Sequence, residues 1–224
     1  MIPWVLLDTV MPPGDGEALR LKRRGAEFSI MSGNIELMNS RLSGSEVALA
    51  TLSCARLQDR PAPRVLIGGL GMGFTLRAAL GALPAQAQVV VAELVPAVIA
   101  WAHGPLAELF GASLNDPRVV ICEGDVGALI RANAAGYDAI LLDVDNGPHG
   151  LSRRENDSLY DLKGLGEAKA ALRPGGVLAI WSSAPDDDFA RRLGRAGFSV
   201  EEVRVRAHRP GKGARHVIWL AGRA

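Results

Sequence analysis

The stretch Arg64–Thr75, RVLIGGLGMGFT, decides the fold class, because a buried apolar run passes directly into a glycine-rich turn and then into a helical pattern. Glycines at Gly69, Gly71 and Gly73 allow a tight turn in which the backbone closes on a flat or anionic ligand at a helix N-terminus. Phe74 excludes two common nucleotide loops, since the dinucleotide fingerprint requires glycine at this position and the phosphate-binding loop requires lysine. Such a turn also arises where a helix simply packs against a strand.

Four more apolar runs follow, and segments with helical spacing separate them. These runs are 88–94 (QVVVAEL), 118–125 (RVVICEGD), 137–145 (YDAILLDVD) and 176–183 (GVLAIWSS). Apolar runs of this kind are typical of parallel strands buried on both faces, so the alternation predicts a Rossmann-like, doubly wound α/β sheet. The tail has two runs in succession, 199–206 and 215–222, which predict a C-terminal antiparallel hairpin and seven strands in all.

The residues before this sheet have a different pattern. Short alternating runs between Leu19 and Met38 are broken by Gly25 and by Gly33-Asn34, which predicts two or three antiparallel strands. Ser43–Leu57 then has apolar residues at helical spacing. We therefore predict a small N-terminal β region over residues 1–42 and an α/β domain over residues 43–224.

Composition sets limits on the class of protein. A chain of 224 residues with 48% hydrophobic content can bury one main core. Its 25 basic and 24 acidic residues nearly cancel, so we expect no nucleic-acid or membrane partner and interpret the basic runs 22–24 and 204–215 as solvated hairpin surfaces.

The cysteines, the histidines and the N-terminus bear on metal binding and on the location of the protein. Cys54 and Cys122 lie in apolar surroundings that suit buried thiols. The four histidines lack metal-ligand spacing, so we expect no metal. The first residues, MIPWVLLDTVMPP, have no basic leader, and we expect a cytoplasmic protein.

Acidic residues stand at the carboxyl ends of three of the predicted strands. Glu93 stands where an acid accepts the hydroxyl groups of a ribose, although it can equally be a solvated strand end. Asp125 can accept a hydrogen bond from an exocyclic amine, can cap the next helix, or can do both. Asp143 and Asp145 place two carboxylates at the mouth of the expected cleft.

Together, the glycine turn and the acids Glu93, Asp125 and Asp143 resemble the class I S-adenosylmethionine-dependent fold. In that class the turn takes the amino-acid end of the cofactor, the acid after the second strand holds the ribose, and the acid after the third reads the adenine. Within it, the N-terminal β region, a leading helix with Glu46, VLIGGLGMG at 65–73 and YDAILLDVDNGP at 137–148 look like the spermidine synthase group.

This resemblance implies transfer of an aminopropyl group from decarboxylated S-adenosylmethionine to a small-molecule amine, with Asp143 removing the proton of the attacking nitrogen. It makes Glu46 and Asp145 candidates for substrate binding. Trp181 ends the fifth strand and is interpreted either as an apolar wall of the substrate cavity or as core packing. The edge of the N-terminal β region pairs with another subunit in relatives, so we predict a homodimer.

Departures from that family keep two alternatives open. Met72 stands where the family has an acid for the aminopropyl nitrogen, and Gly44-Ser45 stands where it has a tyrosine and a histidine. One alternative is therefore a small-molecule methyltransferase that uses ordinary S-adenosylmethionine, and another is a non-catalytic nucleoside-binding relative. The polar stretch 146–160 is interpreted either as a substrate lid or as a solvated connection.

Overall fold

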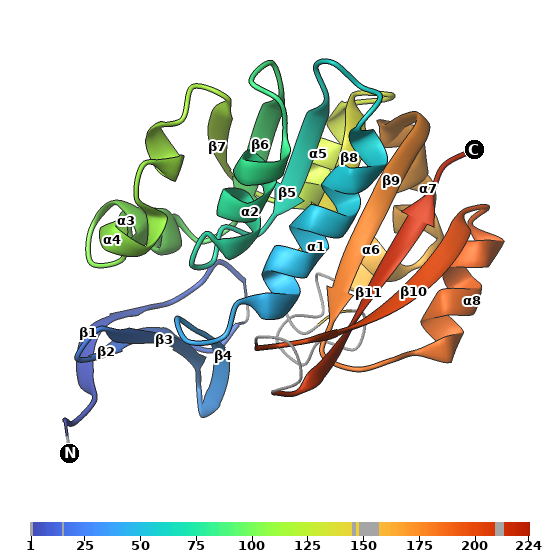
Figure 1. Cartoon of the computed structure of the whole chain (residues 1–224). Helices are drawn as coiled ribbons and strands as arrows, with labels where there is room; N and C mark the ends of the chain where they lie inside the picture. Colours follow the sequence, from blue (N-terminus) through green and yellow to red (C-terminus); the bar gives the residue numbers. More distant parts are fainter. Residues whose placement is uncertain (1, 15, 145–146, 148–156, 209–212) are drawn as a thin grey trace.

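The computed structural model describes residues 2–14, 16–144, 147, 157–208 and 213–224, which form two β-sheets with helices (Figure 1). The smaller sheet is antiparallel, in the order β1 (Val5–Val10), β2 (Leu19–Arg24), β3 (Glu27–Ser32) and β4 (Ile35–Asn39). The sequence predicted two or three strands here. The additional strand β1 was missed because its apolar residues are consecutive rather than alternating.

The larger sheet has seven strands, as predicted, and ends in the predicted antiparallel hairpin. Its spatial order is β10 (Ser199–Arg206), β11 (Arg215–Gly222), β9 (Leu172–Ser182), β8 (Tyr137–Leu142), β5 (Arg64–Gly68), β6 (Gln88–Glu93) and β7 (Val119–Glu123). The five strands from β9 to β7 are parallel, and β11 pairs antiparallel with both β9 and β10. This confirms a mostly parallel, doubly wound sheet.

Helices cover both faces of this sheet because successive residues of its strands point to opposite sides. Val65 and Ile67 pack into one core with the first group of helices, and Leu66 packs into a second core with the other group. The first group is α1 (Gly44–Cys54), α2 (Phe74–Ala82), α3 (Pro96–His103) and α4 (Ala107–Phe110). The second is α5 (Val126–Ala132), α6 (Asp157–Tyr160), α7 (Leu162–Ala171) and α8 (Asp187–Arg195). Short 3₁₀ turns are η1 (Ala55–Leu57) and η2 (Ser113–Asn115).

One segment with helical spacing is split in the structure. Residues 96–110 form α3 and α4 with a break at Gly104 and Pro105, because proline has no backbone N–H to continue the helix. The small sheet shares the first core through side chains such as Leu21 and Phe28. The division into regions 1–42 and 43–224 as separate units stays a prediction.

The order of the strands reverses beside β5, which has β6 on one side and β8 on the other. The chain segments that leave β5 and β8 are close here: the N–H of Asp143 donates to the carbonyl of Gly68 at 3.0 Å. Gly69 has a φ of +90°, and a Cβ at this position would lie 2.5 Å from the carbonyl oxygen of Asp143. This switch point is where ligands bind in open α/β sheets.

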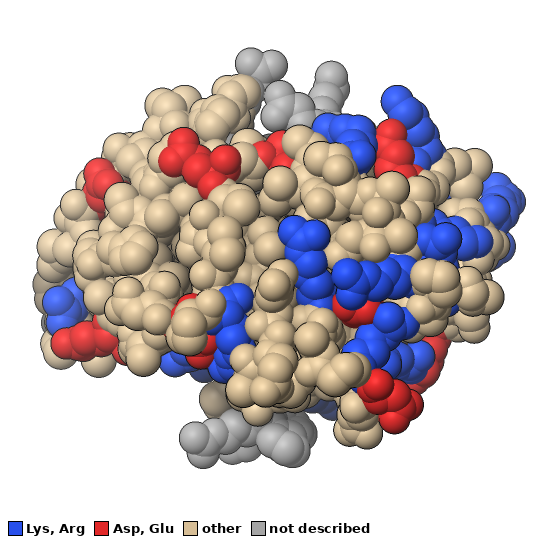
Figure 2. All heavy atoms as spheres, turned by 90° about the horizontal axis from the view of Figure 1, so that it is seen from above, with Lys and Arg blue, Asp and Glu red and all other residues tan. Residues whose placement is uncertain are grey.

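Charged side chains are unevenly spread over the face seen in Figure 2. Lys and Arg gather on the half that carries β9 to β11 and α8, where Asp and Glu are interspersed with them. Ion pairs on this part of the fold include Arg56 with Glu201 and Arg204 with Glu202. Among the described residues, no helix is long and apolar enough to cross a membrane.

Candidate active site

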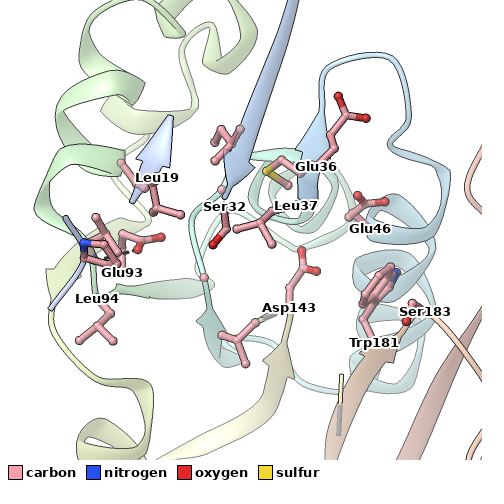
Figure 3. Close-up of a pocket in the computed structure, with 18 of the residues that line it drawn as sticks. Leu19, Ser32, Glu36, Leu37, Glu46, Glu93, Leu94, Asp143, Trp181 and Ser183 are labelled. Atoms are coloured by element: carbon pink, nitrogen blue, oxygen red, sulfur yellow. Dashed lines mark hydrogen bonds between the residues drawn. The ribbon is translucent and has the colours of Figure 1, made fainter. Parts of the chain in front are cut away.

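A cavity of about 430 Å³ lies at the carboxyl ends of the parallel strands, between the large and small sheets. Six carboxylates line it, and among the described residues no Lys or Arg does. The acidic residues are Glu17, Glu36, Glu46, Glu93, Asp125 and Asp143. Figure 3 shows Glu46, Asp143 and Trp181 in one part of the cavity and Glu93 with Leu94 in another. The wall is therefore strongly acidic, with apolar side chains between the carboxylates.

Glu93 is fixed by the backbone around the glycine turn. One of its carboxylate oxygens accepts a hydrogen bond from the N–H of Leu70 and the other from the N–H of Val95, both at 2.9 Å. Its side chain is buried but lines the cavity. The residue thus ties the glycine turn to the end of β6.

The turn itself presents backbone rather than side chains to the cavity. Gly69, Gly71 and Gly73 all have positive φ, and Gly69 and Gly71 line the cavity. Met72, at the position where the resemblance expects an acid, is fully buried in the core and is not among the residues that line the cavity.

Asp125 has the structural role that was one of its two interpretations. Its carboxylate accepts hydrogen bonds from the N–H groups of Gly127 at 2.9 Å and Ala128 at 3.1 Å, which caps α5. It also lies 3.3 Å from the guanidinium of Arg131. Asp125 lines the cavity as well, so a contact with adenine stays a prediction.

Asp143 follows β8 at the switch point and is partly buried. The hydroxyl group of Thr75, in the first turn of α2, donates to one of its carboxylate oxygens at 2.5 Å. Burial, with a further contribution from the negative charge of Glu46, raises the pKa of Asp143 to about 7, and the Thr75 hydrogen bond opposes this. The carboxyl group can therefore exchange a proton near neutral pH.

Glu46 lies in the first turn of α1 and faces the same part of the cavity as Asp143 (Figure 3). Burial raises its pKa, and a hydrogen bond from the Ser45 hydroxyl at 2.7 Å opposes that shift.

Trp181 lies at the end of β9 and is 9% exposed. It belongs to the core and also lines the cavity. Its position therefore fits both core packing and an apolar wall of the cavity.

Two sequence-based candidates lie where the structure gives no description. Asp145 is outside the described residues, and so is most of the predicted lid 146–160, apart from residue 147 and the residues of α6. Among the described residues, no group of His, Cys, Asp and Glu is arranged to hold a metal ion.

Three polar residues of the site were missed from the sequence. Thr75 reaches Asp143, while Ser45 joins Glu46 to His216 on β11. These contacts bridge 68 residues of sequence in one case and 171 in another, so no local pattern reveals them. A polar residue two positions after Gly73 was the available signal for Thr75.

The parallel sheet, its closing hairpin and the ligand cavity at the switch point define a class I methyltransferase-like α/β protein. Comparison with known proteins narrows this class. No protein-family model matches the chain. The chain is 34% identical over 125 residues to a polyamine aminopropyltransferase from Mycobacterium tuberculosis. The aligned residues make up 54% of this chain and 23% of that protein. The chain is also 36% identical over 124 residues to putrescine N-methyltransferase 4 from Nicotiana tabacum. Here the aligned residues make up 53% of this chain and 30% of that protein.

Solved structures extend the likeness over almost the whole chain. Spermidine synthase from Thermotoga maritima matches with a TM-score of 0.77 at 16% identity, over 98% of this chain and 73% of that one. A spermidine synthase in complex with the transition-state analogue AdoDATO matches with a TM-score of 0.76 at 17% identity, over 98% and 72%. At these identities the structural likeness shows the fold.

The predicted resemblance is thus confirmed: the chain resembles polyamine aminopropyltransferases in sequence and spermidine synthases in fold. The relatives with sequence similarity are transferases by name. The matched part of the chain covers only 23% of the length of the mycobacterial relative and 30% of the tobacco one.

Proposed function

We propose that the protein is a spermidine-synthase-like transferase that moves an aminopropyl group from decarboxylated S-adenosylmethionine to an amine. The observation that carries this proposal is the pair Glu46 and Asp143 in a cavity lined by six carboxylates. Negative side chains gathered in this way attract a cationic ligand. Similarity to a polyamine aminopropyltransferase supports the same class of substrate.

The nucleoside half of the donor is assigned to the part of the cavity around β5, β6 and β7. The carboxylate of Glu93 lines the cavity after β6, where an acid suits the ribose hydroxyls, and the backbone of Gly69 and Gly71 allows close approach. Asp125 lies after the neighbouring strand β7, within the same cavity. These residues would orient the donor.

The amine half is assigned to Asp143 and Glu46. An ammonium group is not a nucleophile, so a carboxylate that both attracts it and accepts its proton is required. The raised pKa of Asp143 matches this task at neutral pH. When bound, the sulfonium donor supplies the leaving group, so a carbon–nitrogen bond forms as the carbon–sulfur bond breaks and methylthioadenosine leaves.

The acidic lining also bears on which donor binds. Ordinary S-adenosylmethionine carries a carboxylate on its tail, whereas the decarboxylated form carries only an ammonium group there. Repulsion between like charges disfavours the first in a cavity lined by Glu46 and Asp143, and attraction favours the second. Glu36, held by Ser29 at 2.7 Å and Asn39 at 3.0 Å, adds another carboxylate from the small sheet.

A second candidate function is N-methylation of an amine with ordinary S-adenosylmethionine. Its support is the 36% identity to a putrescine N-methyltransferase, which is slightly higher than the 34% identity to the mycobacterial aminopropyltransferase. The buried side chain of Met72 leaves no acid at the position that the resemblance assigns to the aminopropyl nitrogen. In this version Asp143 and Glu46 would serve the amine in the same way.

The test is to incubate the protein with putrescine or spermidine and each donor separately, and to identify products by mass spectrometry. Aminopropyl transfer predicts methylthioadenosine with the decarboxylated donor. Methyl transfer predicts a methylated amine with ordinary S-adenosylmethionine and would replace the first proposal. Absence of any product with both donors would favour the non-catalytic nucleoside-binding alternative, which binding of methylthioadenosine alone would then support.

We also propose a homodimer through the free edge of the small sheet. Strand β1 is at that edge, and a row of large apolar side chains on and beside it is exposed. They are Ile2, Trp4, Val5, Leu6, Leu7 and Met11. Exposed apolar edges are typical of association surfaces. Light scattering should give twice the mass of the chain, and Leu6→Asp should give a monomer; a monomeric wild type would overturn the proposal.

A further inference from the structure

His216 is connected to the cavity's acidic pair by a chain of hydrogen bonds. Its ring nitrogen Nδ1 lies 2.9 Å from the hydroxyl oxygen of Ser45, and that hydroxyl donates to Glu46 at 2.7 Å. Ser45 is fully buried, and His216 lines the cavity. The chain therefore runs from β11, through the start of α1, to a carboxylate of the site.

The backbone at the start of α1 also lies close to the hairpin of β10 and β11. The N–H of Gly44 donates to the carbonyl of Ala207 at 3.0 Å, and a Cβ on Gly44 would lie 2.7 Å from the carbonyl oxygen of Arg206. Only glycine permits this approach of α1 to the end of β10. Across the hairpin, Arg206 pairs with Arg215, the residue before His216.

The imidazole ring is also held from its other side. Trp181 packs edge-to-face against it, with ring centroids 4.8 Å apart and planes at 76°. Burial lowers the pKa of His216, which favours the neutral ring. Because the single hydrogen of the Ser45 hydroxyl is donated to Glu46, its oxygen must accept from His216, so the neutral ring must carry its proton on Nδ1.

We propose that His216 is a positioning residue for the substrate amine: through Ser45 it fixes one oxygen of Glu46, so that Glu46 and Asp143 together hold one ammonium group. This assignment rests on the proposed function. A side chain as long as glutamate otherwise samples several rotamers, and ordering it beforehand improves binding of the group it contacts. His216 itself need not touch the reacting atoms.

The test compares His216→Phe, which keeps a flat ring against Trp181 but removes the donor, with His216→Asn, which keeps an N–H near the position of Nδ1. We expect His216→Phe to raise the KM for putrescine about fivefold, with kcat changed less than about twofold. His216→Asn should restore most of the loss. Exposed His103, which is outside the cavity, provides the control His103→Phe, and methylthioadenosine affinity should stay constant in all variants.

A second readout does not depend on turnover. ¹⁵N NMR of the histidines should show His216 protonated on Nδ1 in the wild type, and Ser45→Ala should change that signal. An Nε2-protonated ring, an unchanged KM in His216→Phe, or no recovery in His216→Asn would each overturn the positioning role while leaving the proposed function intact. A wild type that neither binds nor converts any amine would instead overturn the proposed function, and this inference with it.

Discussion

The two halves of the cavity hold their carboxylates in different ways. On the side of β5 and β6, Glu93 accepts two backbone N–H groups that belong to the glycine turn and the start of α3. On the side of β8 and α1, Asp143 and Glu46 face one another and are held by the hydroxyl groups of Thr75 and Ser45. Backbone donors leave Glu93 rigidly placed, whereas the facing pair is destabilised by its own like charge.

This difference indicates that the two halves of the cavity suit different chemical groups. A carboxylate fixed by backbone amides suits neutral hydroxyl groups, which need acceptors in constant positions. Two facing carboxylates with raised pKa values gain most when a cation comes between them. We therefore propose that the first half takes a nucleoside and the second an amine. The following substitutions can separate the two halves.

The largest expected effect is that of Asp143→Asn. Asparagine keeps the size of the side chain but cannot accept the proton of the attacking amine, so kcat should fall by about 10²- to 10⁴-fold. Methylthioadenosine binding should change little, because the nucleoside half is intact. Calorimetry and steady-state kinetics measure the two quantities, with Asp187→Asn on the exposed start of α8 as the matched control. Equal loss of nucleoside binding would show that the halves are not separable.

Gly69→Ala should damage both halves at once, because a Cβ would meet the carbonyl oxygen of Asp143 at 2.5 Å and φ is +90°. We expect the free energy of unfolding to fall by about 2–3 kcal/mol. Gly81→Ala is the control: it lies in α2 with open space around it and should raise stability by about 0.5–1 kcal/mol. Urea unfolding measures both. A stable Gly69→Ala protein would contradict the close approach of β5 and β8.

The raised pKa of Asp143 predicts a pH-dependent stability. A carboxyl group with an ordinary value of 3.8 and a folded-state value of about 7 binds its proton more tightly when folded. Its contribution is therefore fully present below about pH 4 and is lost as pH rises toward 7. Between pH 5 and pH 8 the wild type should lose about 2 kcal/mol relative to Asp143→Asn. Urea unfolding at both values provides the measurement, and parallel pH profiles would refute the shift.

The smallest expected effect distinguishes the two roles of Asp125. Serine is also a good N-cap but is too short to reach an adenine amine, so Asp125→Ser should keep stability within about 0.5 kcal/mol. Methylthioadenosine should bind about fivefold more weakly. Asp161, which caps α7 through the N–H of Gly164, offers the control Asp161→Ser with unchanged binding. If Asp125→Ser binds the nucleoside normally, Asp125 is a cap alone.

The nucleoside half of the cavity was largely predictable from the sequence, whereas much of the amine half was not. Apolar runs and the glycine turn predict the parallel sheet and its switch point, and Glu93, Asp125 and Asp143 follow their strands in sequence, so topology alone brings them to one cavity. The amine half depends on contacts between distant segments. His216 was considered only as a metal ligand, because its partner Ser45 is 171 residues away.

The direction of the Met72 side chain could not be predicted from the sequence. A sequence indicates which residue occupies a position but not which way its side chain points, so Met72 in the turn left the choice of donor open. The structure buries Met72 in the core. The acidic character of the cavity comes instead from residues on separate elements, such as Glu36 on β4 and Glu46 on α1, whose proximity only the folded chain reveals.

We propose above all that Asp143 and Glu46 together take an ammonium group beside a bound nucleoside. The most direct measurement is proton release on binding of putrescine to the methylthioadenosine complex at pH 6.5, by calorimetry in buffers of different ionisation enthalpy. A cation placed against Asp143 must lower its pKa from about 7, so the wild type should release protons and Asp143→Asn should release clearly fewer. Binding without proton release, or equal release from both proteins, would contradict the account.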